Sequence, residues 1–81
     1  MIDKEEVKSW VLMELVHFSP KGKVQITDRM SADLQLDSIE LVEFLILAEE
    51  KYNITIDEST VDDDITVEGV ADLIYSLATE G

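Results

Sequence analysis

The chain has no cysteine, a single histidine and only six lysine and arginine residues among its 81 residues. Without cysteine there can be no disulfide framework, and the polypeptide itself supplies no thiol chemistry. No apolar run reaches the length of a membrane-spanning helix, and the first residues lack the basic-then-apolar pattern of a signal peptide. From these absences we expect a cytoplasmic protein with no membrane partner.

Basic residues are outnumbered by 19 aspartates and glutamates, which gives a formal net charge of −13. Such a field repels nucleic acid and attracts basic protein surfaces, so we expect protein partners and no nucleic acid. A role in solubility alone is the alternative reading of this acidity. Apolar residues make up 46% of the chain, which is enough for the core of one small domain.

The first amphipathic helix is expected to open at Asp3, with Glu6 in a capping-box-like position, and to continue to Phe18. The sequence SPKG at residues 19–22 ends it, because proline and glycine resist helix continuation. A long connection over residues 19–36 follows, and it shows no clear periodicity. Its apolar residues should anchor it to the core; they are Val24, Ile26, Met30, Leu34 and Leu36.

A second helix is expected from Asp37 to about Tyr52, with Asp37 as the N-cap and Glu40 completing a capping box. A third begins after Thr66, which is a good cap. Gly69 in the first turn of that helix costs about 1 kcal/mol relative to alanine. The sequence gives no reason for this glycine.

Between these two helices, Asp57 or Ser59 can open one short helical turn around Val61. The apolar alternation at residues 54–56 resembles a strand but has no obvious partner. The sequence therefore predicts an all-α fold, a small four-helix bundle with three long helices, one short helix and a long loop between the first two.

Spacing the residues of the second helix at 100° steps separates two faces. The inward face is apolar and consists of Leu41, Phe44, Leu45, Ala48 and Tyr52. The opposite face has two isoleucines ringed by glutamates, which suits a docking surface with an apolar centre and an acidic rim. Cover by a loop or another helix is the alternative. We define the docking face as Ile39, Glu40, Val42, Glu43, Ile46, Glu49 and Glu50.

The acidic run at residues 62–64 invites comparison with a calcium-binding loop. Counted from Asp57, position 12 is Glu68, as such a loop requires. However, position 5 is Val61, and position 6 is Asp62 where glycine is needed for the sharp turn. We therefore expect a solvated acidic loop and no metal site.

Ser38 stands at the head of the second helix, directly after Asp37. Hydrolysis at Ser38 would need a base, but the only histidine, His17, falls near the end of the first helix, and no glycine-flanked nucleophile elbow surrounds the serine. We therefore expect no catalytic residue. A helix start does favour an anion, so a phosphoester on Ser38 would be stabilised there. A plain first-turn serine beside the Asp37 cap is the alternative.

The stretch DLQLDSIELVEFLILAEEKYNITI, residues 33–56, resembles the acyl carrier protein family, whose hallmark is Asp-Ser-Leu at the start of the second helix. The likeness extends over nearly the whole chain: the long first loop, the E-L-V-E run, the E-E pair before an aromatic residue, and a final T-V-E helix. It implies a 4′-phosphopantetheine arm, taken from coenzyme A, on Ser38 after Asp37. The arm supplies the thiol that the chain lacks and carries acyl intermediates as thioesters. The core would part to shelter an acyl chain, as in fatty-acid members.

Two positions depart from the family pattern. Gln35 stands where the family usually has glycine. If the φ of Gln35 is positive, the backbone stores roughly 1 kcal/mol of strain. Otherwise the loop must follow a different path from that of the family. Ile39 replaces the usual leucine with a stiffer, differently shaped side chain, which bears on partner preference.

The resemblance also implies partners, namely a phosphopantetheinyl transferase and acyl-transferring and ketosynthase-type enzymes whose basic patches meet the docking face and Asp37. It favours fatty-acid or polyketide biosynthesis over peptidyl carriers, which more often have glycines before the serine. Met1 and the clean ends of the chain predict a discrete protein; excision from a multidomain synthase is the alternative. We expect residues 1–81 to form a single carrier domain that is a monomer. The alternative function is an acidic helical adaptor that binds a basic partner without a prosthetic group.

Overall fold

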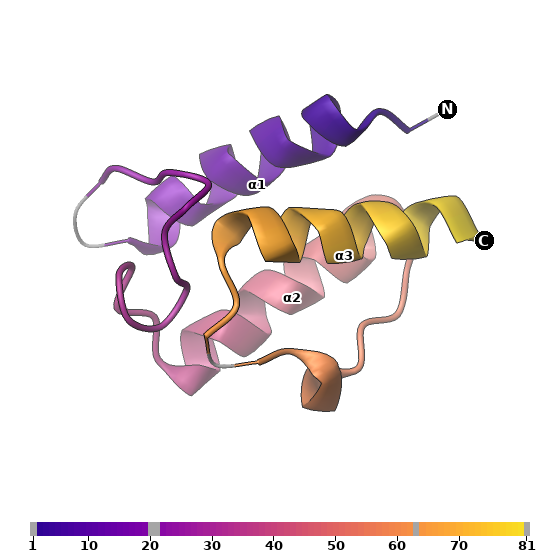
Figure 1. Cartoon of the computed structure of the whole chain (residues 1–81). Coiled ribbons are helices and arrows are strands. Elements are labelled where there is room, and N and C mark those ends of the chain that lie inside the picture. The colour runs from indigo at the N-terminus through magenta and orange to yellow at the C-terminus, as the bar shows by residue number, and fades with distance from the viewer. Residues whose placement is uncertain (1, 20–21, 63, 81) are drawn as a thin grey trace.

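The computed structural model describes residues 2–19, 22–62 and 64–80, and shows three α-helices (Figure 1). They are α1 (Lys4–Phe18), α2 (Ser38–Tyr52) and α3 (Val67–Glu80). A single 3₁₀ turn, η1 (Glu58–Thr60), lies between α2 and α3. The described ranges contain no strand, only an isolated bridge between Arg29 and Thr66. The all-helical prediction is confirmed, whereas the expected fourth helix is only one 3₁₀ turn and a four-helix count is not confirmed.

Helix α1 begins and ends close to the predicted residues. The Asp3 carboxylate accepts the backbone N–H of Glu5 at 3.2 Å, so the cap differs from the predicted capping box with Glu6. At the other end, the N–H of Ser19 donates to the carbonyl of Leu15. Pro20 and Lys21 of the predicted helix-breaking sequence lie outside the described residues.

The predicted start of α2 is confirmed in detail. Asp37 accepts the backbone N–H of Glu40 at 2.7 Å, and Glu40 accepts the N–H of Asp37 at 3.3 Å, which completes the capping box. The helix ends at Tyr52, and its C-cap is Asn53, whose φ of 54° lies in the left-handed region that asparagine tolerates.

Thr66 caps α3, because its hydroxyl oxygen accepts the N–H of Gly69 at 3.1 Å. The structure also explains this glycine. A Cβ at position 69 would lie 2.9 Å from Cγ1 of Ile65, closer than side chains normally approach. Gly69 therefore lets the chain before α3 fold back against the first turn of the helix.

The core draws on every helix and on both long connections. At its edge, the partly buried Trp10 stacks on Phe44 with ring centroids 5.8 Å apart and makes an edge-to-face contact with Tyr52 at 5.5 Å. Phe18 meets Phe44 edge-to-face at 6.2 Å. The buried apolar residues are Val7, Val11, Leu15, Met30, Leu34, Leu36, Phe44, Leu45, Ala48, Ile56, Val67, Val70, Ala71 and Ile74.

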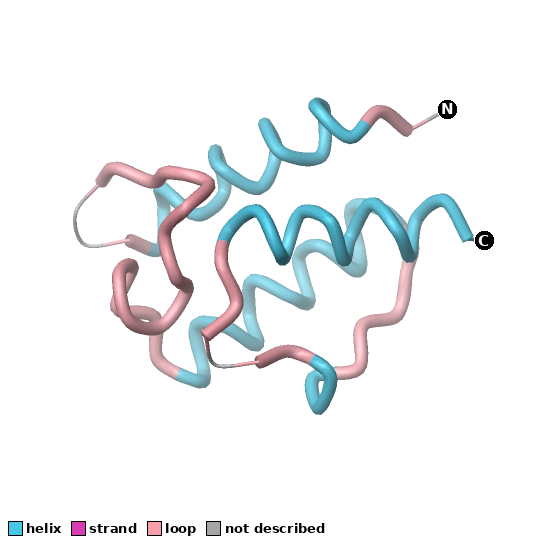
Figure 2. Tube along the Cα trace, viewed as in Figure 1, coloured by secondary structure: helices cyan, strands magenta, loops and turns pink. Residues whose placement is uncertain are grey.

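The first connection is fastened to the segment that leads into α3 (Figure 2). The N–H of Met30 donates to the carbonyl of Ile65, and the N–H of Val67 donates to the carbonyl of Asp28. Three of the predicted anchors in this connection, Met30, Leu34 and Leu36, are buried. The connection is therefore held by both apolar burial and backbone hydrogen bonds.

Two ion pairs join α1 to α3. Lys4 Nζ lies 2.8 Å from a carboxylate oxygen of Asp72, and Lys8 Nζ lies 3.8 Å from one of Glu68. The hydrogen bond to Asp72 raises the pKa of Lys4. Both residues of the first pair are exposed and the second pair is long, so these pairs contribute little against the self-repulsion of an acidic chain. None of the described helices is both long and apolar enough to cross a membrane.

Candidate functional site

Ser38 is the first residue of α2, and its side chain is exposed. Its hydroxyl makes no hydrogen bond to any residue that the structure describes. The neighbouring Asp37 carboxylate is already engaged by the backbone of Glu40. Asp37 is therefore the residue that caps α2. The Ser38 hydroxyl remains available for modification, at a helix end that favours negative charge.

The corner before Ser38 is held by its two buried neighbours. Leu34 is fully buried and Leu36 nearly so, while Gln35 between them is exposed. The φ of Gln35 is 59°, which turns the chain so that both leucines enter the core. The N–H of Leu36 also donates to the carbonyl of Met30. The sequence-based expectation of strain at Gln35, conditional on a positive φ, therefore applies.

A groove of about 200 Å³ opens directly beside Ser38. It lies between α2 and the segment that includes η1, and polar side chains and branched apolar side chains both line it. Its lining residues are Ser31, Asp37, Ser38, Leu41, Val42, Leu45, Glu58 and Val61. Sequence reasoning missed this groove, because it depends on how η1 and the first connection fold against α2.

The turn η1, on the far side of this groove, is fixed by its own cap. Asp57 accepts the N–H of Ser59 at 3.0 Å and the Ser59 hydroxyl at 2.7 Å. These hydrogen bonds lower the pKa of Asp57, because they stabilise its charged form. Glu58 and Val61, which line the groove, are thereby held in position next to Ser38.

The structure brings the residues of the docking face together along the outer side of α2. Ile39 is 68% exposed and Ile46 is 45% exposed, so no described loop or helix covers them. Glu43 and Glu50 are also exposed, whereas Glu40, Val42 and Glu49 are half-buried. Leu47 of the same helix is also exposed and adds to the apolar surface.

One member of the docking face has a structural duty that the sequence did not reveal. The Glu49 carboxylate accepts the backbone N–H of Ile56 at 2.7 Å. This bond ties the segment after α2 back to the helix. Glu49 therefore has one oxygen engaged within the chain, which reduces its freedom to meet a partner.

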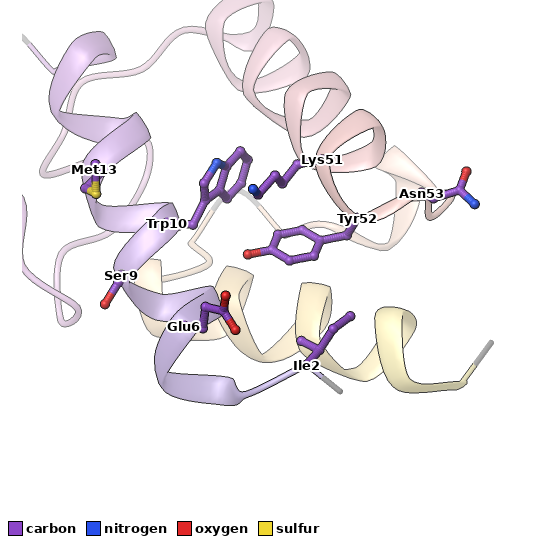
Figure 3. Close-up of a pocket in the computed structure, with 8 residues that line it drawn as sticks. All are labelled: Ile2, Glu6, Ser9, Trp10, Met13, Lys51, Tyr52 and Asn53. Carbon is purple, nitrogen blue, oxygen red and sulfur yellow. The ribbon is translucent and has the colours of Figure 1, made fainter.

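A second groove, of about 570 Å³, lies at the opposite end of α2 (Figure 3). Trp10 and Tyr52 are among its apolar lining residues, and Lys51 and Glu6 also line it. Burial, and to a lesser degree the charge of Glu6, raises the pKa of Tyr52. At 1.5 Å rise per residue, Tyr52 is about 20 Å along α2 from Ser38. This groove is therefore separate from the Ser38 corner.

The remaining residues considered from sequence do not join the Ser38 site. His17 is exposed near the end of α1, on a different helix from Ser38. Within the described parts of the chain, no group of three or more histidine, aspartate or glutamate side chains is placed to hold a metal ion. Asp63 of the acidic run lies outside those parts.

Comparison with known families adds to this geometry. The family described as a phosphopantetheine attachment site matches residues 12–74. The chain is also 38% identical over 61 residues to acyl carrier protein 1, chloroplastic, of Hordeum vulgare. The chain belongs to the acyl carrier protein family. That match covers 75% of the carrier chain and 41% of the barley protein, so the chain spans about two fifths of the relative's length. No solved structure matches it.

Membership of the acyl carrier protein family assigns the cofactor class. The prosthetic group is a covalently attached 4′-phosphopantetheine. The chain fits such a group at the Ser38 corner, where an exposed hydroxyl without a hydrogen-bond partner among the described residues stands at a helix N-terminus beside a groove. The absence of cysteine agrees with a prosthetic group that brings its own thiol.

Proposed function

We propose that this chain tethers acyl intermediates as thioesters on a 4′-phosphopantetheine arm attached to Ser38, and delivers them to enzymes of fatty-acid or polyketide biosynthesis. The observation that carries the proposal is the exposed hydroxyl of Ser38 at the first residue of α2, which has no hydrogen-bond partner among the residues that the structure describes. Carrier proteins of this family are not themselves catalytic. The arm, when attached, supplies the thiol that forms the thioester; the polypeptide supplies the attachment oxygen, the recognition surface and the scaffold.

Each residue at the Ser38 corner has a distinct part in this proposal. Ser38 Oγ is the attachment atom, and the N-terminus of α2 favours the negative charge that a phosphodiester brings. Asp37 holds the start of the helix through its bond to Glu40, so it positions the serine and presents its outer face to partners. Gln35 directs the corner outward between two buried leucines.

We further propose that partner enzymes bind the docking face. Ile39 and Ile46 offer an exposed apolar centre, and Glu43 and Glu50 offer charge at its edge. A basic patch on a phosphopantetheinyl transferase, or on an acyl-transferring or ketosynthase-type enzyme, complements this arrangement. The association rate should therefore fall as ionic strength rises.

We propose that residues 1–81 form a single carrier domain that acts as a monomer in the cytoplasm. The barley relative is named chloroplastic, so the compartment is best determined directly by fractionation of the host cell. Sedimentation of the purified protein tests the monomeric state.

The attachment is tested by intact mass. Wild-type protein, incubated with coenzyme A and a phosphopantetheinyl transferase, should gain the mass of one arm, and Ser38→Ala should gain none. Ser59→Ala is a matched control, because Ser59 is another exposed serine at the start of a helical turn; it should load like the wild type. A wild type that stays unmodified would favour the acidic adaptor that binds a basic partner without a prosthetic group.

The docking face is tested separately by the kinetics of loading. Ile46→Ser and Glu43→Lys should each raise the KM of the transferase for the carrier without unfolding it. Val16→Ser is the control, since Val16 is also exposed, at 41%, but lies on α1. An equal effect of all three changes would place recognition elsewhere.

A further inference from the structure

The groove of about 570 Å³ between α1 and the end of α2 is continuous with the docking face. Glu50 of the docking face directly precedes Lys51 of the groove lining, and the exposed Leu47 lies one turn before Lys51 on the same side of α2. We propose that this groove is a second contact for the basic partner that covers the docking face, and that it takes an arginine side chain of that partner. The inference rests on the proposed docking function and extends recognition from α2 to α1.

Two aromatic side chains form a corner in this groove. Trp10 of α1 and Tyr52 of α2 make an edge-to-face contact with ring centroids 5.5 Å apart. Both rings line the groove and both are only partly buried, so part of each ring remains open to it. A guanidinium group is planar and weakly hydrated, and it stacks on aromatic rings, whereas a lysine ammonium is compact and strongly hydrated. The corner therefore favours arginine among the basic side chains of a partner.

The carboxylate of Glu6 supplies the negative charge of the site. Glu6 lines the groove from α1 (Figure 3), and its carboxylate forms no ion pair or hydrogen bond with any residue that the structure describes. Burial and, after it, the charge of Glu6 raise the pKa of Tyr52, so this charge acts within the groove. A guanidinium in the aromatic corner can donate hydrogen bonds to the carboxylate, and such charge-assisted bonds are stronger than neutral ones.

Lys51 already brings a cation to this corner. Its side chain extends from α2 toward Trp10 (Figure 3), and its ammonium forms no ion pair within the described ranges. The exposed side chain of Lys51 is flexible, so it can move out when the guanidinium of a partner enters. Lys51 is therefore a competitor for the site, and its removal should strengthen the binding of the partner.

Charge and geometry favour a protein side chain over a free cation. The net charge of −13 attracts basic protein surfaces. One contact of a cation with aromatic rings and one exposed ion pair are each weak, but a partner already held on the docking face presents its arginine at a high effective concentration. The groove lies about 20 Å along α2 from Ser38, so an arginine bound there leaves the attachment oxygen free.

The experiment measures the KM of a phosphopantetheinyl transferase for the carrier. Glu6→Gln should raise this KM roughly three-fold, which is the scale of one exposed ion pair. Glu5→Gln is the matched control, because it removes the same charge from the neighbouring exposed residue, which does not line the groove; it should leave the KM nearly unchanged. Lys51→Gln should lower the KM, whereas Lys23→Gln, which removes an exposed lysine of the first connection, should not.

A fluorescence titration reads the groove itself, because Trp10 is the only tryptophan of the chain. N-acetylarginine amide, added at constant ionic strength, should change the Trp10 emission in a saturable way. N-acetylcitrulline amide has nearly the same shape but no charge, and it should not produce this change. Glu6→Gln should weaken the response to the arginine compound, and Lys51→Gln should strengthen it.

The outcomes separate this proposal from the proposed function. If Glu5→Gln raises the KM as much as Glu6→Gln, general attraction explains the effect and the groove contact is overturned. If the arginine compound binds but Glu6→Gln leaves the KM unchanged, the groove takes free guanidinium compounds, and the contact with a partner is likewise overturned. Equal responses to the arginine and citrulline compounds overturn the assignment to arginine. In all three cases the attachment stands if intact mass shows full loading; it falls only if the wild type gains no mass.

Discussion

Replacing Gln35 by glycine should make the protein more stable. Gln35 is exposed and has a φ of 59°, a left-handed conformation that costs a residue with a Cβ about 1–2 kcal/mol. Glycine removes that cost but loses more freedom on folding, which offsets roughly 0.5–1 kcal/mol. The net gain expected for Gln35→Gly is about 0.5–1 kcal/mol, because little side-chain burial is lost.

Thermal and urea unfolding followed by circular dichroism measure this gain. For a domain of this size the melting temperature should rise by roughly 3–6 °C, with the urea midpoint moving upward and the slope of the transition unchanged. Gln35→Ala is the matched control: it also shortens the side chain, but it keeps a Cβ at the same φ, so its stability should stay near that of the wild type.

A second control uses Asn53, the C-cap of α2, which is the other non-glycine residue with a positive φ among those that the structure describes. Asparagine tolerates this conformation better than glutamine, so Asn53→Gly should gain less than Gln35→Gly. If Gln35→Gly proves no more stable than the wild type, or if Gln35→Ala gains as much, backbone strain at this corner is not the cause.

The other predictions concern caps, close packing and charge. Gly69→Ala should lower the free energy of unfolding by about 1 kcal/mol or more, despite the better helix propensity of alanine, because the new Cβ would lie 2.9 Å from Ile65. Urea unfolding measures this loss, and a gain in stability would contradict the close contact. Asp37→Ala should lower the free energy of unfolding by about 1 kcal/mol because it removes the α2 cap, whereas Asp37→Asn should keep most of that stability. If urea unfolding shows the same loss for both variants, the cap is not the cause. Added magnesium or salt should raise the melting temperature, because the net charge is −13; an unchanged melting temperature would contradict self-repulsion.

The helices could be predicted from sequence because their signals are local. Asp37 and Glu40 stand at the spacing of a capping box, and Thr66 stands one residue before α3. The apolar periodicity of α2 also gave both of its faces, including the exposed Ile39 and Ile46. Such features depend on residues within two turns of one another, so a single sequence contains them.

The rest depends on contacts between distant segments. A Cβ at position 69 would clash with the side chain of Ile65. Ile65 is held in place by the first connection, because its carbonyl accepts a hydrogen bond from the N–H of Met30. The duty of Glu49 as an acceptor for Ile56 depends on how the chain turns after α2. The groove beside Ser38 likewise needs the relative placement of η1 and α2. Period and composition do not specify these long-range distances.

The attachment oxygen was predicted from a serine at a helix start together with the family resemblance. The structure adds that the Ser38 hydroxyl is exposed and that Asp37 has taken over the capping bond. Sequence alone left open whether Ser38 was an ordinary first-turn residue. The geometry favours an available hydroxyl over a capping one.

The most direct measurement locates the arm on the polypeptide. Carrier loaded with coenzyme A and a phosphopantetheinyl transferase is cleaved by trypsin, which should release residues 30–51, between Arg29 and Lys51, as one peptide holding both Ser31 and Ser38. Fragmentation of that peptide should place the phosphopantetheine on Ser38. An arm found on Ser31, on any other residue, or on no residue would contradict the account.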